Sequence, residues 1–111
     1  MDAQPMKILD LTETDFDQTV LQSPVPVLVD FWSPSCMPCR ALVPVLDALA
    51  TENGDDIRIV KVNAAESIAL AAKYGVDMLP TLLFFSGGKV VERMVGAQSQ
   101  DKIQNALDDI D

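Results

Sequence analysis

Two cysteines, Cys36 and Cys39, are the residues whose type and spacing point most directly to chemistry. They are separated by Met37 and Pro38, and they stand where an apolar stretch gives way to a pattern typical of a helix. Residues three apart lie on the same side of a helix, with β-carbons about 5–6 Å apart, so a slight tightening of the first turn reaches disulfide distance. The pair is therefore predicted to form and break a disulfide locally.

The predicted place of Cys36 at a helix N-terminus gives the two sulfurs different roles. Unpaired backbone N–H groups and the helix dipole favour the thiolate over the thiol there, so Cys36 is the expected nucleophile. Cys39, one turn further along, is the expected resolving thiol, which attacks a mixed disulfide and releases the reduced substrate. Pro38 suits the first turn of a helix, where its missing N–H has no intrahelical partner. Arg40 would add positive potential.

Two other interpretations of the cysteine pair stay open. Cysteines in an intracellular chain are commonly small buried apolar residues, and a Cys-x-x-Cys pair also binds zinc or softer metals. The sequence has no histidine and no third cysteine, so a tetrahedral zinc site would need carboxylates or a second subunit, and no metal site is predicted. A two-coordinate copper(I) carrier and a structural subunit without redox turnover are the non-enzymatic alternatives.

Asp30 interrupts an apolar stretch just before the cysteines. Burial there would disfavour the charged carboxylate and raise its pKa, and a buried acid that titrates near neutrality can exchange a proton with Cys39. Without histidine, a carboxylate, a lysine or water must assist thiol deprotonation. Lys61, in the stretch IRIVKVN, is the predicted neighbour that moderates the pKa shift of Asp30. An exposed Asp30 at a strand end and a solvated Lys61 are the alternatives.

Hydrophobic periodicity predicts the elements that must position these residues. Strands are expected at 7–11, 25–32, 57–62, 81–85 and 90–95, and helices at 12–22, from Cys36 to 53, at 65–74 and from Ser99 onward. The strand at 25–32 is apolar almost throughout, which favours a central place in a sheet covered on both faces. The order βαβαβαββα predicts an α/β fold in which helices flank a mixed sheet.

Short local signals mark where several of these elements begin, turn or end. Thr12, three residues before Asp15, resembles a helix-capping arrangement, and Gly75 closes the helix at 65–74. The sequence SGGK between the last two strands is a strong signal for a short hairpin, so these strands are predicted to be antiparallel. Pro44 lies inside the second helix and predicts a kink there.

Composition and charge limit the function classes. The chain has 111 residues, 49% of them apolar, which is enough for one core, so a single domain spanning 1–111 is predicted. No apolar run approaches the roughly 20 residues of a spanning helix. The net charge of −9 disfavours nucleic acid and anionic membranes as partners. The N-terminus carries Asp2 and lacks a signal-like pattern, so a cytoplasmic location is expected.

The ordered set of motifs resembles the thioredoxin family along essentially the whole chain. The matching segments are LVDFW, Cys-x-Pro-Cys followed by a basic residue, VPVLDALA, IVKVN, YGV, LPTLLFF and VGA. The resemblance implies a thioredoxin-like fold with a central mixed five-stranded sheet and four flanking helices. It also implies that Cys36 attacks, Cys39 resolves and Asp30 is the buried carboxylate. Pro80 matches the family's cis-proline.

The resemblance implies a contact surface for substrates around the disulfide, with Trp32 packed beside the centre. The expected contact residues are Trp32, Met37, Pro38, Met78, Leu79, Pro80, Val95, Gly96 and Ala97. Departures from the family pattern border this surface. Met37 stands where glycine is typical, Ser35 where many members have a second tryptophan, and Asp77 and Met78 where a smaller residue is common. These changes bear on the redox potential and the range of partners.

The leading hypothesis is a disulfide reductase with no cofactor beyond the redox-active Cys36–Cys39 disulfide. Protein disulfides are the expected substrates, a thioredoxin reductase is the expected electron donor, and the chain is expected to be a monomer. An isomerase or oxidant of the same fold is the alternative within the family. A reduction potential well above the roughly −270 mV of thioredoxin would indicate that alternative.

Overall fold

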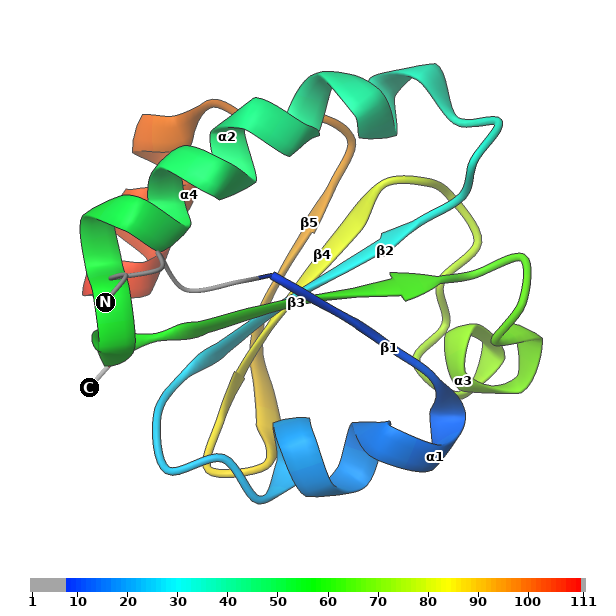
Figure 1. Ribbon diagram of the computed structural model, residues 1–111, viewed down its shortest axis with the longest axis horizontal. Helices are drawn as coiled ribbons and strands as arrows, with labels where there is room; N and C mark the ends of the chain where they lie inside the picture. Colours follow the sequence, from blue (N-terminus) through cyan, green and yellow to red (C-terminus); the bar gives the residue numbers. More distant parts are fainter. Residues whose placement is uncertain (1–7, 111) are drawn as a thin grey trace, which may run out of the picture.

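A computed structural model describes residues 8–110 of the chain (Figure 1). The strands are β1 (Leu9–Leu11), β2 (Val27–Trp32), β3 (Arg58–Asn63), β4 (Thr81–Ser86) and β5 (Lys89–Val95). The helices are α1 (Glu13–Phe16), α2 (Met37–Asn53), α3 (Ile68–Lys73) and α4 (Gln100–Asp108). A π-helical segment at Asp17–Leu21 extends α1, and a 3-10 turn at Gly54–Asp56 follows α2. The predicted order βαβαβαββα and the five-stranded mixed sheet are confirmed.

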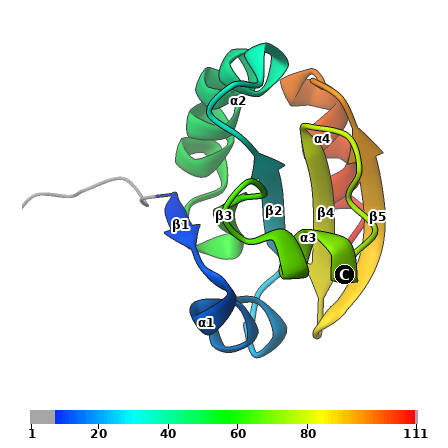
Figure 2. The ribbon, with the colours of Figure 1, turned by 90° about the vertical axis from the view of Figure 1, so that its right-hand side faces the viewer.

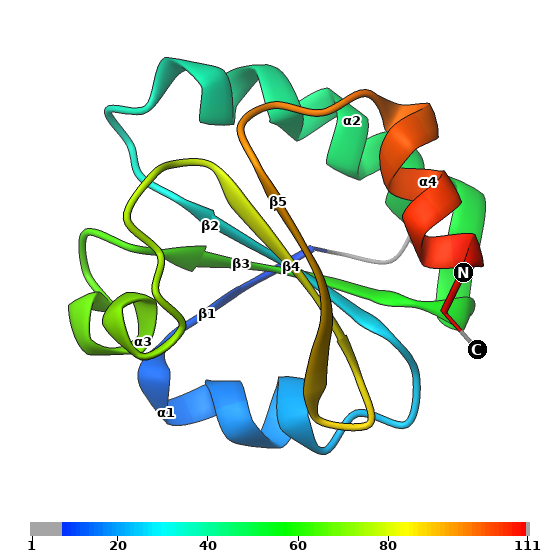
Figure 3. The same cartoon turned by 180° about the vertical axis from the view of Figure 1, so that it is seen from behind.

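The sheet has the strand order β1-β3-β2-β4-β5, with β2 at its centre. β2 runs parallel to β3 and antiparallel to β4, and β4 pairs with β5 in an antiparallel hairpin. The edge strand β1 lies at the front of Figure 1, and the other edge strand, β5, lies at the front of Figure 3, which shows the opposite side. The predicted central place of the apolar strand is therefore confirmed.

Helices cover both faces of the sheet, α2 and α4 on one and α1 and α3 on the other (Figures 1 and 2). Alternate residues of each strand enter opposite cores, because side chains of a strand point to its two faces in turn. Leu28 of β2 packs with Leu42 and Leu46 of α2, whereas Val29 belongs to the core that contains Phe16. Asp30 follows Val29 and so points to the α2 side of the sheet.

Two predicted helices differ from the structure. The helix expected at 65–74 begins only at Ile68, because the Asn63 side-chain oxygen accepts the Ala65 N–H at 2.9 Å and holds residues 64–66 in a turn. The helix expected at 12–22 is α-helical only as far as Phe16. Thr12 is the residue before it, but its hydroxyl donates to the Asp15 carboxylate at 3.3 Å and caps no backbone N–H.

Other local predictions agree with the structure. The hairpin between β4 and β5 turns at Gly87 and Gly88, whose φ angles of 59° and 82° are those that glycine adopts at low cost. A β-carbon at Gly88 would also lie 3.0 Å from the Leu21 carbonyl oxygen. Ser99 caps α4 by accepting the Lys102 N–H at 3.1 Å. α2 continues through Pro44 to Asn53, and the kink stays a prediction.

The first strand was expected to begin at Lys7, which lies outside the described residues, and β1 begins at Leu9. Between residues 8 and 110, no helix combines the length and the apolar character needed to cross a membrane.

Candidate active site

The cysteine pair lies where the central strand gives way to the longest helix. β2 ends at Trp32, a short turn follows, and α2 begins at Met37 with Cys36 as its N-cap residue. The Cys36 N–H donates to the Ser33 carbonyl oxygen at 3.2 Å, which closes the turn. Because β2 is held on both sides by neighbouring strands, its end is a fixed support for this turn. The predicted position of Cys36 at a helix N-terminus is confirmed.

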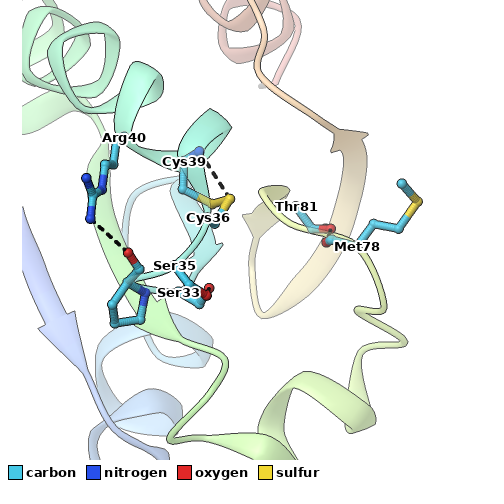
Figure 4. Close-up of a disulfide and its surroundings, with 8 residues drawn as sticks. Ser33, Ser35, Cys36, Cys39, Arg40, Met78 and Thr81 are labelled. Carbon is cyan, nitrogen blue, oxygen red and sulfur yellow. Dashed lines mark hydrogen bonds between the residues drawn. A yellow bond between two sulfur atoms is a disulfide. The ribbon is translucent and has the colours of Figure 1, made fainter.

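Cys36 and Cys39 form a disulfide with their Cα atoms 5.3 Å apart (Figure 4). The Cys36 sulfur also accepts the backbone N–H of Cys39 at 3.2 Å. This hydrogen bond uses one of the N–H groups at the start of a helix that have no intrahelical acceptor. An N–H aimed at the Cys36 sulfur stabilises negative charge there once the disulfide is reduced.

The two sulfurs differ in access to solvent. Cys39 is 3% exposed and belongs to the buried face of α2, whereas Cys36 is only partly buried. An incoming disulfide can therefore approach Cys36 more readily than Cys39. The structure thus distinguishes the two cysteines by exposure, and their roles as attacking and resolving thiols stay predictions.

Asp30 lies on the β2 face covered by α2 and is 1% exposed. Its Oδ1 atom has no hydrogen-bond partner within residues 8–110. Desolvation by burial raises the pKa of Asp30 from 3.8 to about 7, while the charge of Lys61 lowers this pKa and that of Asp10 raises it. The alternative of an exposed Asp30 is wrong, and the effect of Lys61 on the Asp30 pKa has the predicted direction.

Lys61 occupies the β3 position paired with Asp30. Its ammonium nitrogen lies 4.6 Å from the centre of the Trp32 ring, which is a cation–π geometry. Lys61 is half-buried, so the alternative of a fully solvated lysine does not hold. The indole N–H of Trp32 is buried and has no acceptor among the described residues. Sequence reasoning placed Lys61 near Asp30 but missed its contact with Trp32, which depends on the strand register.

A pocket of about 260 Å³ is lined by both Asp30 and Cys39. Its walls also include Trp32 and Lys61, and its rim includes Arg40. The pocket therefore places the buried carboxylate and the buried sulfur beside the same small volume. The Arg40 guanidinium donates to the Pro34 carbonyl oxygen at 3.2 Å, so this side chain folds back over the turn before the cysteines (Figure 4).

The segment before β4 lies across from the disulfide in Figure 4. The Leu79–Pro80 peptide bond is cis, as the resemblance implied. The Thr81 hydroxyl donates to the Met78 carbonyl oxygen at 2.6 Å, and Thr81 pairs with Phe31, close to the end of β2. This register brings Pro80 to the end of the sheet where α2 begins. Sequence reasoning missed Thr81, whose signal was a hydroxyl residue directly after the proline.

The end of β5 completes this side of the centre. Val95 pairs with Thr81 and is 44% exposed, and the Gly96 N–H donates to the Pro80 carbonyl oxygen at 2.8 Å. Gly96 has a φ of 90°, a backbone conformation that a side chain would strain. Ala97 is exposed beside it. Met37 and Met78 are exposed, whereas Leu79 is half-buried and Pro80 is buried.

The chemical groups gathered here suit sulfur exchange. Within the described part of the chain, no three His, Cys, Asp or Glu side chains are grouped so that they could hold a metal ion. The two sulfurs, one partly exposed at a helix N-terminus and one buried, can pass two electrons to or from a disulfide. The buried acid, with a pKa of about 7, can accept or release the accompanying proton.

Comparison with known proteins assigns the family. The Thioredoxin family model matches residues 7–109. Thioredoxin 1 of Synechococcus elongatus is 44% identical over 98 residues, which cover 88% of this chain and 92% of that protein. Thioredoxin of Haemophilus influenzae is 40% identical over 101 residues, or 91% and 94% of the two chains. Thioredoxin of Streptomyces clavuligerus is 49% identical over 89 residues, or 80% and 82%.

These matches extend over nearly the whole chain and include the paired cysteines at the start of α2. The chain belongs to the thioredoxin family and is a dithiol/disulfide oxidoreductase with a Cys-x-x-Cys active site.

Proposed function

We propose that this chain reduces protein disulfides through nucleophilic attack by Cys36. The observation that carries the assignment is the difference in access between the two sulfurs, because Cys36 is partly exposed and Cys39 is 3% exposed. The Cys36 thiolate attacks one substrate sulfur, the substrate S–S bond breaks, and one substrate thiolate leaves. Substrate and protein are then joined by a mixed disulfide.

Cys39 completes the reaction. Its thiolate attacks the Cys36 sulfur, the mixed disulfide breaks, and the second substrate thiolate leaves. The substrate has gained two electrons, and Cys36 and Cys39 are joined as an oxidised pair. Asp30 supports this step as the acceptor of the Cys39 proton, because both side chains line the same pocket and the pKa of Asp30 is raised to about 7.

A thioredoxin reductase is the proposed electron donor that returns the pair to the dithiol state. The chain is proposed to act as a single-domain monomer, since the complete set of groups for the exchange comes from one copy. The proposed contact surface consists of the residues around the disulfide, namely Trp32, Met37, Pro38, Met78, Leu79, Pro80, Val95, Gly96 and Ala97. The cytoplasmic location stays a prediction from the sequence.

Trapping tests the two cysteine roles together. The Cys39→Ser protein should hold a disulfide substrate as a stable mixed disulfide on Cys36, detectable by mass spectrometry of the linked peptide. The Cys36→Ala protein should lose reduction of insulin disulfides. Capture through another residue, or activity retained without Cys36, would remove the proposed mechanism. A reduction potential well above the about −270 mV of thioredoxin would instead indicate an oxidant or isomerase.

A further inference from the structure

The most exposed large apolar side chains gather at the disulfide end of the molecule. Met37, Ile68 and Met78 are 69%, 68% and 62% exposed, and no other large apolar side chain of the described residues exceeds 49%. Met37 follows Cys36, Met78 precedes Leu79 and Pro80, and Ile68 begins α3. Figure 1 shows the start of α2 and the whole of α3 at the same end of the sheet. Exposed apolar groups that gather in this way mark an interaction surface.

A groove bordered by Ile68 lies between α3 and the segment at 76–79. Its volume is about 270 Å³, and its walls include Ile68, Ala72, Val76 and Leu79. Asp77 is the one charged residue in the lining. The small alanine side chains on α3 leave the space that a larger side chain from a partner would fill.

The groove continues into the active site through Leu79. This residue lines the groove and is joined to Pro80, whose carbonyl oxygen accepts the Gly96 N–H beside the disulfide. On the other side, the Ala64 N–H donates to the Trp32 carbonyl oxygen at 2.8 Å, which attaches the turn before α3 to the end of β2. A protein segment whose sulfur reaches Cys36 can therefore extend along Leu79 to the groove.

Asp77 gives the groove an exposed negative charge. The Lys73 ammonium lies 5.6 Å from the centre of the Tyr74 ring, and the Arg93 guanidinium donates to the Tyr74 carbonyl oxygen. Both cations are thus directed to Tyr74, whereas Asp77 is exposed. With a formal net charge of −9, the chain also repels acidic partners and attracts basic ones.

We infer that this groove anchors disulfide-bearing protein partners that carry a bulky apolar side chain next to a lysine or arginine, close in sequence to the attacked cysteine. The apolar side chain enters between Ile68 and Leu79, and the cation pairs with Asp77. The inference rests on the proposed function and specifies its substrate class. Ile68 and Asp77 are specificity residues, since neither lies beside the sulfur atoms.

Peptide disulfides without tryptophan provide the probes. Each probe consists of two copies of one peptide joined by a disulfide between their single cysteines, and a Phe-Lys pair lies one to four residues from that cysteine. Matched peptides carry Phe-Glu, Ser-Lys or Ser-Glu in place of Phe-Lys. Oxidation of the reduced protein can be followed through fluorescence of Trp32, the single tryptophan. Hydroxyethyl disulfide serves as the reference substrate, because it is too small to occupy the groove and the cysteine centre together. Each peptide rate constant is divided by the rate constant for this reference.

At the best spacing, the Phe-Lys peptide should react about tenfold faster than Ser-Lys, as expected for burial of one aromatic side chain. It should also react several-fold faster than Phe-Glu, with the charge effect shrinking at high salt. Ile68→Ser should remove most of the preference for Phe, and Asp77→Asn most of the preference for Lys. Val91→Ser is the matched control, because Val91 is 49% exposed on β5 and does not line this groove.

The outcomes separate this inference from the function on which it rests. Equal normalised rates for all four peptides would overturn the groove assignment. It would also be overturned if the preferences for Phe and Lys survived in both Ile68→Ser and Asp77→Asn, or if Val91→Ser lost them equally. Failure of the unaltered protein to reduce even hydroxyethyl disulfide would overturn the proposed reductase function itself.

Discussion

Asp30 and Lys61 stand opposite one another on β2 and β3, and both side chains line the pocket that ends at Cys39. The pairing places a buried acid, a half-buried cation and a buried sulfur around one small volume. Burial raises the pKa of Asp30 to about 7, even though the charge of Lys61 lowers it.

Replacement of Asp30 by asparagine should stabilise the oxidised protein at high pH. Between pH 3.8 and about 7 the folded protein keeps a proton that the unfolded chain releases, so the free energy of unfolding falls as pH rises through this window. The difference between these pKa values corresponds to about 4 kcal/mol. Denaturant unfolding at pH 8 should show a gain of several kcal/mol for Asp30→Asn, and at pH 4 little difference.

Asp10→Asn is the matched control for this stability effect. Asp10 is an exposed carboxylate on β1 and contributes only the smallest of the three named effects on the Asp30 pKa. Its replacement should change the free energy of unfolding by less than about 0.5 kcal/mol. An Asp30→Asn protein no more stable than the unaltered protein at pH 8 would show that the buried carboxylate carries no desolvation cost.

The same Asp30→Asn replacement should slow the second chemical step more than the first. Cys39 then lacks its proton acceptor, and loss of a general base costs about a hundredfold or more in rate. In single-turnover experiments, the mixed disulfide on Cys36 should therefore persist longer near pH 7. The rate of its resolution should rise with a pKa near 7 in the unaltered protein, and this rise near pH 7 should be lost in the variant. Identical pH profiles would exclude Asp30 as the proton acceptor.

Replacement of Lys61 by methionine should raise the pKa of Asp30 further, because the lysine charge now lowers it. The pH dependence of mixed-disulfide resolution should then move to higher pH. Fluorescence of Trp32 should change as well, since the ammonium 4.6 Å from the ring centre is lost. Lys61→Arg keeps a cation over the ring and should stay close to the unaltered protein. A pH profile unmoved in Lys61→Met would mean that the two charges are not coupled.

Thr81 should matter through the shape of the turn at 78–81. Its hydroxyl holds the Met78 carbonyl oxygen at 2.6 Å, and the residue is 1% exposed. Thr81→Ala should cost about 1–2 kcal/mol in stability through the lost hydrogen bond and methyl group. It should also raise KM for insulin, because Met78 and Leu79 lose their fixed position.

Thr81→Ser keeps the hydroxyl and should retain most of the affinity for insulin. The comparison separates the hydrogen bond from the packing of the methyl group, which both variants lose. If the serine variant lost insulin affinity as fully as the alanine variant, the hydroxyl would not be what fixes the turn.

Local pattern was enough to locate the cysteine centre in the fold. The apolar stretch before the pair predicted a central strand, and the helical spacing after it placed Cys36 at a helix start, as β2 and α2 show. Both signals depend on neighbours in the chain, and a buried strand next to a periodic helix has few other ways to pack. For the same reason, burial of Asp30 could be predicted from the apolar residues on both sides of it.

Local pattern failed where side chains had a choice between partners. The Thr12 hydroxyl donates to Asp15 and does not cap α1, and the Asn63 side chain holds a turn where helical spacing predicted the start of α3. Both alternatives use the same polar groups at similar cost, so composition and spacing did not distinguish them.

The sequence by itself determined the dithiol chemistry, the α/β order and the burial of the acid, because each is written in adjacent or regularly spaced residues. Only the tertiary structure decided that Lys61 lies over Trp32, that Thr81 holds Met78, and that Ile68 and Asp77 share a groove with Leu79. These contacts join separate segments, and they depend on the strand register and on how α3 packs against the sheet. Register and packing are properties of the whole fold, which is why no single segment revealed them.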